Sequence, residues 1–227
     1  MWKSKTNMHQ KSIKVWDVYI RAFHWLLVIS IVASWITIEL RQMQLHELCG
    51  YFILFLLITR LCWGVIGSST ARFARFIKGP LHSWRYLISS MKGRSDYHTG
   101  HNPAGAWMVI AFIIVLGAQI ATGLLSNNDV GFSGALADQV SKDKSDRFTE
   151  LHGLIFNLLL MAVWLHLVAV FFYVLVKNQN LIKAMITGKK PEDQTNRSEK
   201  IRLYGTKRLL PVLIISAIPI VYLYCFA

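Results

Sequence analysis

The stretch from Leu151 to Val176 reads LHGLIFNLLLMAVWLHLVAVFFYVLV and contains no Asp, Glu, Lys or Arg. About 20 apolar residues suffice to cross the hydrocarbon core of a bilayer as a helix. Two histidines interrupt this run, His152 and His166, and they are fourteen residues apart. On a helix they lie roughly 21 Å apart along the axis and point to nearly the same face. The stretch therefore predicts a transmembrane helix that presents two imidazoles on one side, one near each membrane surface.

Four further apolar runs have the length of membrane spans. Hydrophobic residues make up 54% of the 227 residues and charged residues 16%, well below the roughly 25% of charged residues that is usual in soluble domains. We therefore predict an all-α membrane protein: a four-helix transmembrane bundle with a fifth, C-terminal transmembrane helix. The last run carries two prolines, which membrane helices tolerate. The expected spans are Val18–Ile38, Leu45–Ile66, Gly105–Leu125, Leu151–Val176 and Leu209–Ala227.

The basic residues lie mainly on one side of these spans. The N-terminal tail, the connection between the second and third spans, and the segment after the fourth span are all rich in Lys and Arg. On the other side, one loop has Arg41, and the loop 127–150 has three basic and five acidic residues. Because cytoplasmic loops carry the excess of Lys and Arg, the N-terminus is predicted to be cytoplasmic. The net charge of +13 thus fits a membrane surface, and no nucleic-acid recognition motif is present.

One connection is predicted to form a helix of its own. The sequence PLHSWRYLISSMK, from Pro80 to Lys92, places apolar residues on one helical face. Such a pattern is typical of an amphipathic helix that lies on the membrane surface. The apolar positions are Leu81, Trp84, Leu87, Ile88 and Met91.

Four of the eight histidines lie inside predicted spans: His24, His46, His152 and His166. Ionisable side chains are costly in hydrocarbon, so they indicate a function. His46 and His152 each lie one residue into the outer end of a span, whereas His24 and His166 lie fourteen to fifteen residues from the outer ends. Depth therefore predicts that His46 pairs with His152 near the outer face, and that His24 pairs with His166 towards the cytoplasm.

Two axial imidazoles on each iron suit a b-type haem. Zinc or copper are the competing metals, but two pairs about 20 Å apart cannot join in one site. We therefore expect two haem b groups per chain, with the four histidines as iron ligands. Gly50, one turn after His46, is expected to leave room for a flat macrocycle, with helix packing as the alternative role. Arg21 and Arg60 are expected to be cations for the haem propionates, and snorkelling to the membrane surface is the alternative, more so for Arg21 than for Arg60. Cys49, Cys62 and Cys225 form no Cys-x-x-Cys-His motif, so covalent haem attachment is not encoded.

Short motifs surround these positions: RAFHW at 21–25, HELCG at 46–50, RLCWGVIG at 60–67, ARF at 71–73, GHNPAG at 100–105, ELHG at 150–153 and WLH at 164–166. In combination, over about residues 15–190, they resemble the bacterial cytochrome b561 and nickel-hydrogenase cytochrome b family. The resemblance implies a four-helix bundle of the bacterial inner membrane with two b haems, whose ligand positions fall on the four histidines. The run 209–227 lies outside the resemblance.

This organisation divides the chain into four expected parts. They are a cytoplasmic tail at 1–16, a di-haem cytochrome b transmembrane domain at 17–190, a polar cytoplasmic linker at 191–208 and an extra transmembrane helix at 209–227. By resemblance, the domain moves electrons between quinone or quinol in the membrane and a redox partner, which is a periplasmic cytochrome c or a hydrogenase small subunit. Membrane lipid and a second copy in a homodimer are further expected partners, and no catalytic residue is assigned.

His101 and Asn102 lie at the cytoplasmic start of the third span. They are candidates to contact a propionate or to line a quinone pocket, and hydrogen bonding in a loop or helix cap explains them equally well.

Two alternative functions stay open. A stand-alone quinol oxidase or superoxide:quinone oxidoreductase needs a route for the oxidant, and the acidic outer loop opposes the steering of superoxide to that face. A haem-free proton-coupled transporter or membrane anchor would use the histidines as a proton path. An absorption spectrum without a Soret band would favour the latter.

Overall fold

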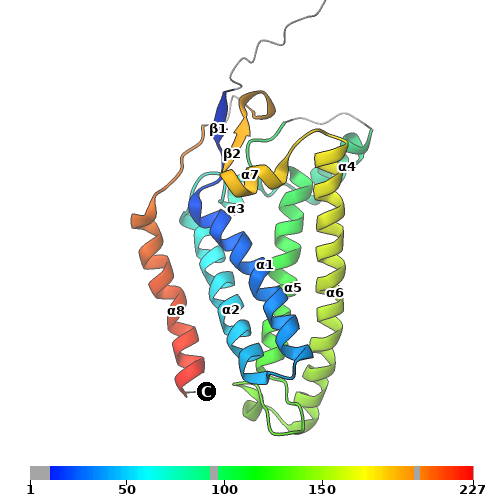
Figure 1. Ribbon diagram of the computed structural model, residues 1–227, viewed down its shortest axis with the longest axis vertical. Coiled ribbons are helices and arrows are strands. Elements are labelled where there is room, and N and C mark those ends of the chain that lie inside the picture. The colour runs from blue at the N-terminus through cyan, green and yellow to red at the C-terminus, as the bar shows by residue number, and fades with distance from the viewer. Residues whose placement is uncertain (1–10, 93–96, 197–199, 227) are drawn as a thin grey trace, which may run out of the picture.

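The structure is a computed structural model that describes residues 11–92, 97–196 and 200–226. Four long helices run side by side as a bundle (Figure 1): α1 (Val18–Glu39), α2 (Met43–Ile66), α5 (Pro103–Leu124) and α6 (Lys142–Leu175). Among the described residues, these four are long and apolar enough to cross a membrane. The predicted four-helix transmembrane bundle is therefore confirmed. Residues 1–10 of the predicted tail, residues 197–199 of the predicted linker and Ala227 of the predicted fifth span lie outside the described residues.

Short elements cover the end of the bundle at which α1 begins (Figure 1). We call this end the inner end, because the sequence predicts it to be cytoplasmic, and the opposite end the outer end. A 3-10 turn, η1 (Ala137–Gln139), lies in the connection between α5 and α6 at the outer end. The remaining elements are β1 (Ser12–Lys14), α3 (Phe73–Phe76), α4 (Pro80–Met91), α7 (Leu181–Thr187), β2 (Lys189–Pro191), the 3-10 turns η2 (Glu192–Gln194) and η3 (Thr206–Arg208), and α8 (Leu209–Phe226).

The start of α1 is fixed by the carboxylate of Asp17. Its Oδ1 accepts a hydrogen bond from the backbone N–H of Ile20 at 2.7 Å, which satisfies one of the free donors at a helix N-terminus. Its Oδ2 accepts a hydrogen bond from Nε1 of Trp63 at 3.0 Å, and Trp63 is 1% exposed. A single side chain therefore caps α1 and ties it to the last turn of α2.

Replacing Asp17 with Ala is expected to lower the free energy of unfolding by about 1–3 kcal/mol, because a cap is lost and the indole N–H is left buried without an acceptor. Thermal unfolding of the detergent-solubilised chain measures this as a lower melting temperature. Asp17→Asn keeps an oxygen for the cap, so its melting temperature should lie between those of Asp17→Ala and the unsubstituted chain. A melting temperature of Asp17→Ala equal to that of the unsubstituted chain would contradict the role given to this carboxylate.

The helix α6 begins nine residues before the predicted span, at Lys142 rather than Leu151. These first residues are polar, and the Lys142 ammonium pairs with Asp146 one turn later. The outer loop also holds them, because Ser145 Oγ donates to the carbonyl oxygen of Leu125 at 2.7 Å and accepts from Asn127 Nδ2 at 2.8 Å. Local polar contacts thus extend the helix beyond its apolar part, which hydropathy alone does not predict.

A two-stranded antiparallel sheet joins the predicted tail to the boundary between the predicted transmembrane domain and the predicted linker. Ser12 pairs with Pro191 and Lys14 with Lys189. The N–H groups of Val15 and Trp16 both donate to the carbonyl oxygen of Gly188. Gly188 ends α7 in the left-handed conformation at φ +78°, which favours glycine. This sheet was not predicted from the sequence, and it places the start and the end of residues 12–191 next to each other at the inner end.

The last helix, α8, lies beside α2 (Figure 1). Val212 is buried in the same apolar cluster as Trp63, and the ring of Tyr224 makes an edge contact with the ring of Tyr51 at 6.5 Å between centroids. The segment that leads into α8 is held against the inner end of α2 by hydrogen bonds of its backbone. The N–H of Tyr204 donates to Ser68 Oγ at 2.9 Å, and the carbonyl oxygen of Arg202 accepts from the N–H of Ser69 at 2.9 Å. The segment is helical, as predicted, and its crossing of the membrane stays a prediction.

The middle of the bundle is an apolar layer. Side chains from three of the long helices meet there and are almost fully buried. Along α2 and α6 they lie, in sequence, between the histidine near the outer end and the functional candidates near the inner end. The layer therefore separates the two ends of the bundle. Its buried residues are Ile53, Leu57, Leu116 and Leu159.

Candidate functional site

The structure brings the four intramembrane histidines together in two pairs. The ring centroids of His46 on α2 and His152 on α6 are 6.2 Å apart, with 79° between the ring planes. Those of His24 on α1 and His166 on α6 are 6.4 Å apart, with 51° between the planes. These are the pairs that depth predicts from the sequence. The helix α6 supplies one member of each pair.

Both separations fit one iron ion between two imidazoles. A coordinating histidine nitrogen lies about 2 Å from its metal, and the ring centre lies roughly 1 Å further. Two imidazoles on opposite sides of one metal thus have centres about 6 Å apart, as in both pairs. Among the described residues, no three His, Cys, Asp or Glu side chains gather where they could hold an ion. Two protein ligands suit a haem, whose macrocycle supplies four nitrogen ligands of its own.

Backbone carbonyl groups orient the outer pair. His46 Nδ1 donates to the carbonyl oxygen of Ser34 at 2.9 Å, and His152 Nδ1 donates to the carbonyl oxygen of Gln119 at 2.9 Å. A carbonyl oxygen only accepts, so both Nδ1 atoms carry the proton, and both Nε2 lone pairs are left for a metal. Such contacts fix the tautomer and ring orientation of a histidine ligand.

A cavity of about 360 Å³ adjoins the outer pair. His46, His152, Gly50, Gly123 and Gly153 are among the residues that line it. A Cβ atom on Gly50 or Gly153 would meet no atom within 4 Å, whereas a Cβ on Gly123 would lie 2.9 Å from His152 Cε1. Gly50 and Gly153 thus leave open space at the level of the imidazoles, as a flat macrocycle requires, whereas Gly123 allows the His152 ring to pack against α5.

The side chain of Gln119 also reaches the outer pair. Its Nε2 lies 3.1 Å from His152 Nε2, which is the nitrogen that remains for a metal. Coordination at this nitrogen therefore requires the amide to turn aside into the cavity, which Gln119 also lines. Gln119 was not predicted as a site residue, although it is a polar residue within the apolar run of α5, which is a signal in the sequence.

The guanidinium group of Arg60 lies at the inner end of α2. Arg60 is 3% exposed, and neither Nη1 nor Nη2 has a hydrogen-bond partner among the described residues. Its Cζ lies 4.7 Å from the ring centroid of Phe73. A buried guanidinium without an acceptor calls for an anion. A haem propionate has the charge and oxygen acceptors to fill this role, so this residue fits the cofactor predicted from the sequence.

The side chain of Arg21 is partly engaged by the protein. Its Nη1 donates to the carbonyl oxygen of Ile186 in α7 at 2.7 Å. Its Nε is buried without a partner among the described residues, as is Nδ1 of His24 one turn later. Arg21 therefore ties α1 to α7 and keeps one donor for a ligand beside His24.

His101 is enclosed at the inner end by two aromatic rings. Its ring centroid lies 4.7 Å from that of Trp16 and 4.7 Å from that of Phe76. Burial, together with the charges of Arg60 and Lys190, lowers the pKa of His101 to about 3. Its imidazole is therefore neutral at physiological pH, and Nδ1 has no hydrogen-bond partner in the described part of the chain.

Asn102 has a defined structural contact. Its Oδ1 accepts a hydrogen bond from the N–H of Gly105 at 2.7 Å, which caps the N-terminus of α5. This contact is the helix-cap alternative weighed in the sequence analysis. The cap positions the loop that carries His101.

Comparison with known families adds independent information. A sequence model described as prokaryotic cytochrome b561 matches residues 15–188. The matched range contains all four paired histidines and ends before α8. A search of curated proteins found no match.

Proposed function

Because the chain belongs to the prokaryotic cytochrome b561 family, a family of membrane b-type cytochromes in electron transfer, we propose that it binds two haem b groups and carries electrons across the membrane. In this proposal one haem lies between His46 and His152 and the other between His24 and His166. The electrons pass between the quinone pool and a redox partner protein on the other side.

The observation that carries the proposal is the pair of imidazole couples at two levels of one bundle, with centroid separations of 6.2 Å and 6.4 Å. A packed or hydrogen-bonded histidine has no need of a second histidine at this separation. The spacing of His152 and His166 along α6, about 21 Å, places the two proposed haems near opposite membrane surfaces.

The protein residues have separate tasks in this proposal. When bound, each haem supplies a one-electron carrier. The carbonyl groups of Ser34 and Gln119 accept from Nδ1 of the outer imidazoles, so Nε2 is the nitrogen of each ring that would coordinate. The layer with Leu57, Leu116 and Leu159 is nearly fully buried, so it keeps water out of the region between the two levels.

The inner end supplies cations for the acidic groups of a haem. Arg60, with both Nη atoms unbonded, is the principal candidate, and Arg21 keeps its Nε. His101 contributes a neutral donor or acceptor at the same end. His101 and Asn102 are also where a quinone head group is proposed to bind, because both lie at the inner end and Nδ1 of His101 has no hydrogen-bond partner among the described residues.

The outer surface suits a basic partner. The loop 127–150 has five acidic and three basic residues, and complementary charge speeds the encounter of electron-transfer proteins. We therefore propose a periplasmic cytochrome c or a hydrogenase small subunit as the partner there, rather than an anionic oxidant.

A redox-difference spectrum combined with a pyridine haemochrome assay tests the proposal. The expected result is two low-spin b haems per chain, both reduced by added quinol in proteoliposomes. A purified chain with a single haem would remove the relay, and a chain without a Soret band would favour the transporter or anchor alternative.

Replacing Arg60 with Gln is expected to lower the midpoint potential of the inner haem by several tens of millivolts. A nearby cation favours the reduced, more negative state, so its removal favours the oxidised state. Potentiometric titration that resolves the two haems measures the effect. Arg202→Gln removes an exposed cation and is the control, with both potentials unchanged. Equal shifts of both haems in Arg60→Gln would contradict its assignment to the inner site.

A further inference from the structure

The helix α4 turns two serines towards the protein and large apolar side chains outwards. Ser83 and Ser90 are buried, at 6% and 2% exposed, whereas Leu81 and Trp84 are both 61% exposed and Ile88 is 39% exposed. In a soluble helix the apolar face packs against the core. The bundle does not cover this face of α4, so something else that is apolar must shield it from water.

Two hydrogen bonds fix the depth of α4. The hydroxyl groups of Tyr86 in α4 and Tyr173 in α6 are 3.3 Å apart, and Tyr173 lies two residues before the end of α6. At the other end, Nε1 of Trp107 in the second turn of α5 donates to the carbonyl oxygen of Lys78 at 3.1 Å. The helix therefore lies where the apolar spans end, which is the head-group level of a bilayer.

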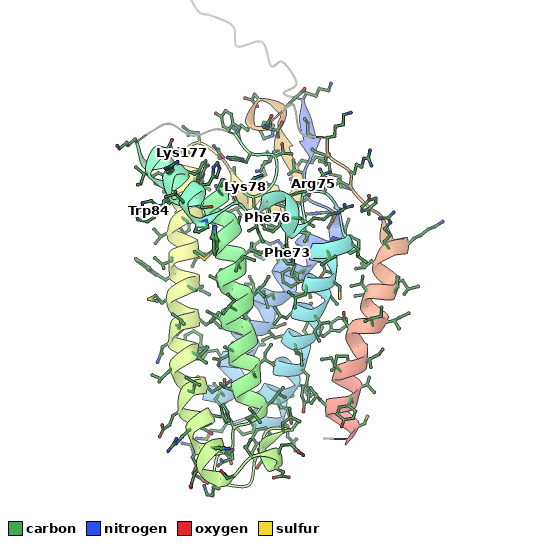
Figure 2. All side chains as sticks on the ribbon, turned by 180° about the vertical axis from the view of Figure 1, so that it is seen from behind. Phe73, Arg75, Phe76, Lys78, Trp84 and Lys177 are labelled. Atoms are coloured by element: carbon green, nitrogen blue, oxygen red, sulfur yellow. The ribbon has the colours of Figure 1, made fainter. Side chains whose placement is uncertain are left out.

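Basic residues surround this apolar face, and acidic residues are absent from its sequence. Figure 2 shows Lys78, Trp84 and Lys177 at the same end of the bundle. Lys78, Arg85 and Lys92 are exposed, and the sequence from Gly67 to Lys92 contains no Asp or Glu. Anionic head groups attract such juxtamembrane cations.

We propose that α4 and its flanking cations bind anionic phospholipids of the inner leaflet. Leu81, Trp84 and Ile88 contact the acyl chains just below the head groups, and Lys78, Arg85 and Lys177 contact the phosphates. Interfacial amphipathic helices bind membranes in this way, and tryptophan is enriched at this depth. The inference goes beyond the proposed electron transfer and does not depend on how many haems are bound.

Lipid explains the face better than a soluble protein partner does. The exposed apolar face lies at the ends of α5 and α6, whose own outer surfaces also expose large apolar residues such as Ile114 and Leu175. The same bilayer that covers those spans thus reaches α4 without any further component. The cations around α4 then select anionic over zwitterionic head groups.

Native mass spectrometry tests the selectivity on the full-length holoprotein released from nanodiscs of equal phosphatidylglycerol and phosphatidylcholine. The ratio of the two lipids among the retained adducts is the readout. The triple variant Lys78→Gln, Arg85→Gln, Lys177→Gln is expected to lower this ratio by at least about fivefold, which is the effect of a single cation near an anionic surface. The control variant Lys11→Gln, Lys14→Gln, Lys189→Gln removes as many exposed cations from the region around β1 and β2, and should keep the ratio. An unchanged circular dichroism spectrum confirms that both variants are folded, whatever their haem content.

An equal fall of the ratio in both variants, or no fall in the triple variant at α4, would overturn the proposal. A photo-crosslinking amino acid in place of Trp84 tests the occupant directly in native membranes. Adducts with the mass of phosphatidylglycerol are expected. Adducts dominated by a protein would show a docking surface for another chain instead, and adducts of zwitterionic phospholipids alone would refute the selectivity.

Discussion

Replacement of His152 with Ala is expected to leave the purified chain with one b haem instead of the two proposed. His152 is the α6 member of the outer pair, 6.2 Å from His46 between ring centroids, and the remaining imidazole cannot hold an iron in six-coordinate, low-spin form. His46→Ala should give the same result. His24→Ala and His166→Ala should instead lose the inner haem. The pyridine haemochrome assay counts the haems, and low-temperature difference spectra identify which one remains.

His82→Ala is the control for this series, because His82 is an exposed residue of α4. It should keep the full haem content. Loss of both haems in His152→Ala, with the chain still folded by circular dichroism, would contradict two independent sites. Unchanged haem content in all four variants would contradict the ligand assignment itself.

Replacement of Gly123 with Ala is expected to weaken binding of the outer haem by about 10–100-fold, the range seen when contacts that orient a metal ligand are lost. The added Cβ would lie 2.9 Å from His152 Cε1, so the ring must move. The ring is also held by its hydrogen bond to the Gln119 carbonyl, which limits its freedom to give way. Titration of the apoprotein with haem measures the affinity of the outer site.

Gly117→Ala is the matched control. Gly117 lies six residues earlier on α5, and a Cβ there would meet only Leu57 Cδ2, at an ordinary 3.9 Å. Both substitutions replace glycine by alanine inside a helix, which favours the helix by about 0.5–1 kcal/mol. A selective loss in Gly123→Ala thus reports on the His152 ring, whereas equal haem affinity in the two variants would contradict the steric argument.

Much of this structure follows from helix geometry applied to the sequence. A rise of about 1.5 Å per residue was enough to place His152 and His166 at two levels on one face, and to match each with a partner on another span. The start of α1 at Val18 and the end of α2 at Ile66 also agree with the predicted spans. These features depend on hydropathy and local periodicity, which are properties of neighbouring residues.

The features that the sequence did not predict depend on contacts between distant residues. The strand β1 has three residues, too few for a periodic pattern, and its partner β2 lies about 175 residues later in the chain. The groups of Ser34 and Gln119 that bind the histidines are backbone carbonyls. Every residue has such a group, so the sequence does not reveal which carbonyls take this role. The sequence predicted that α4 has an apolar face. It did not predict how the helix is attached to the bundle, because the hydrogen bonds to Tyr173 and Trp107 join residues far apart in the chain.

In the proposed arrangement, both sites draw one ligand from α6. Helices resist stretching, because every backbone group is hydrogen-bonded along the axis. The separation of the two irons is then set by the covalent length of a single segment, independent of how the surrounding loops are built. Loops can grow or shrink between relatives without altering the distance over which an electron must tunnel, and a change of length within α6 has the largest consequence for that distance.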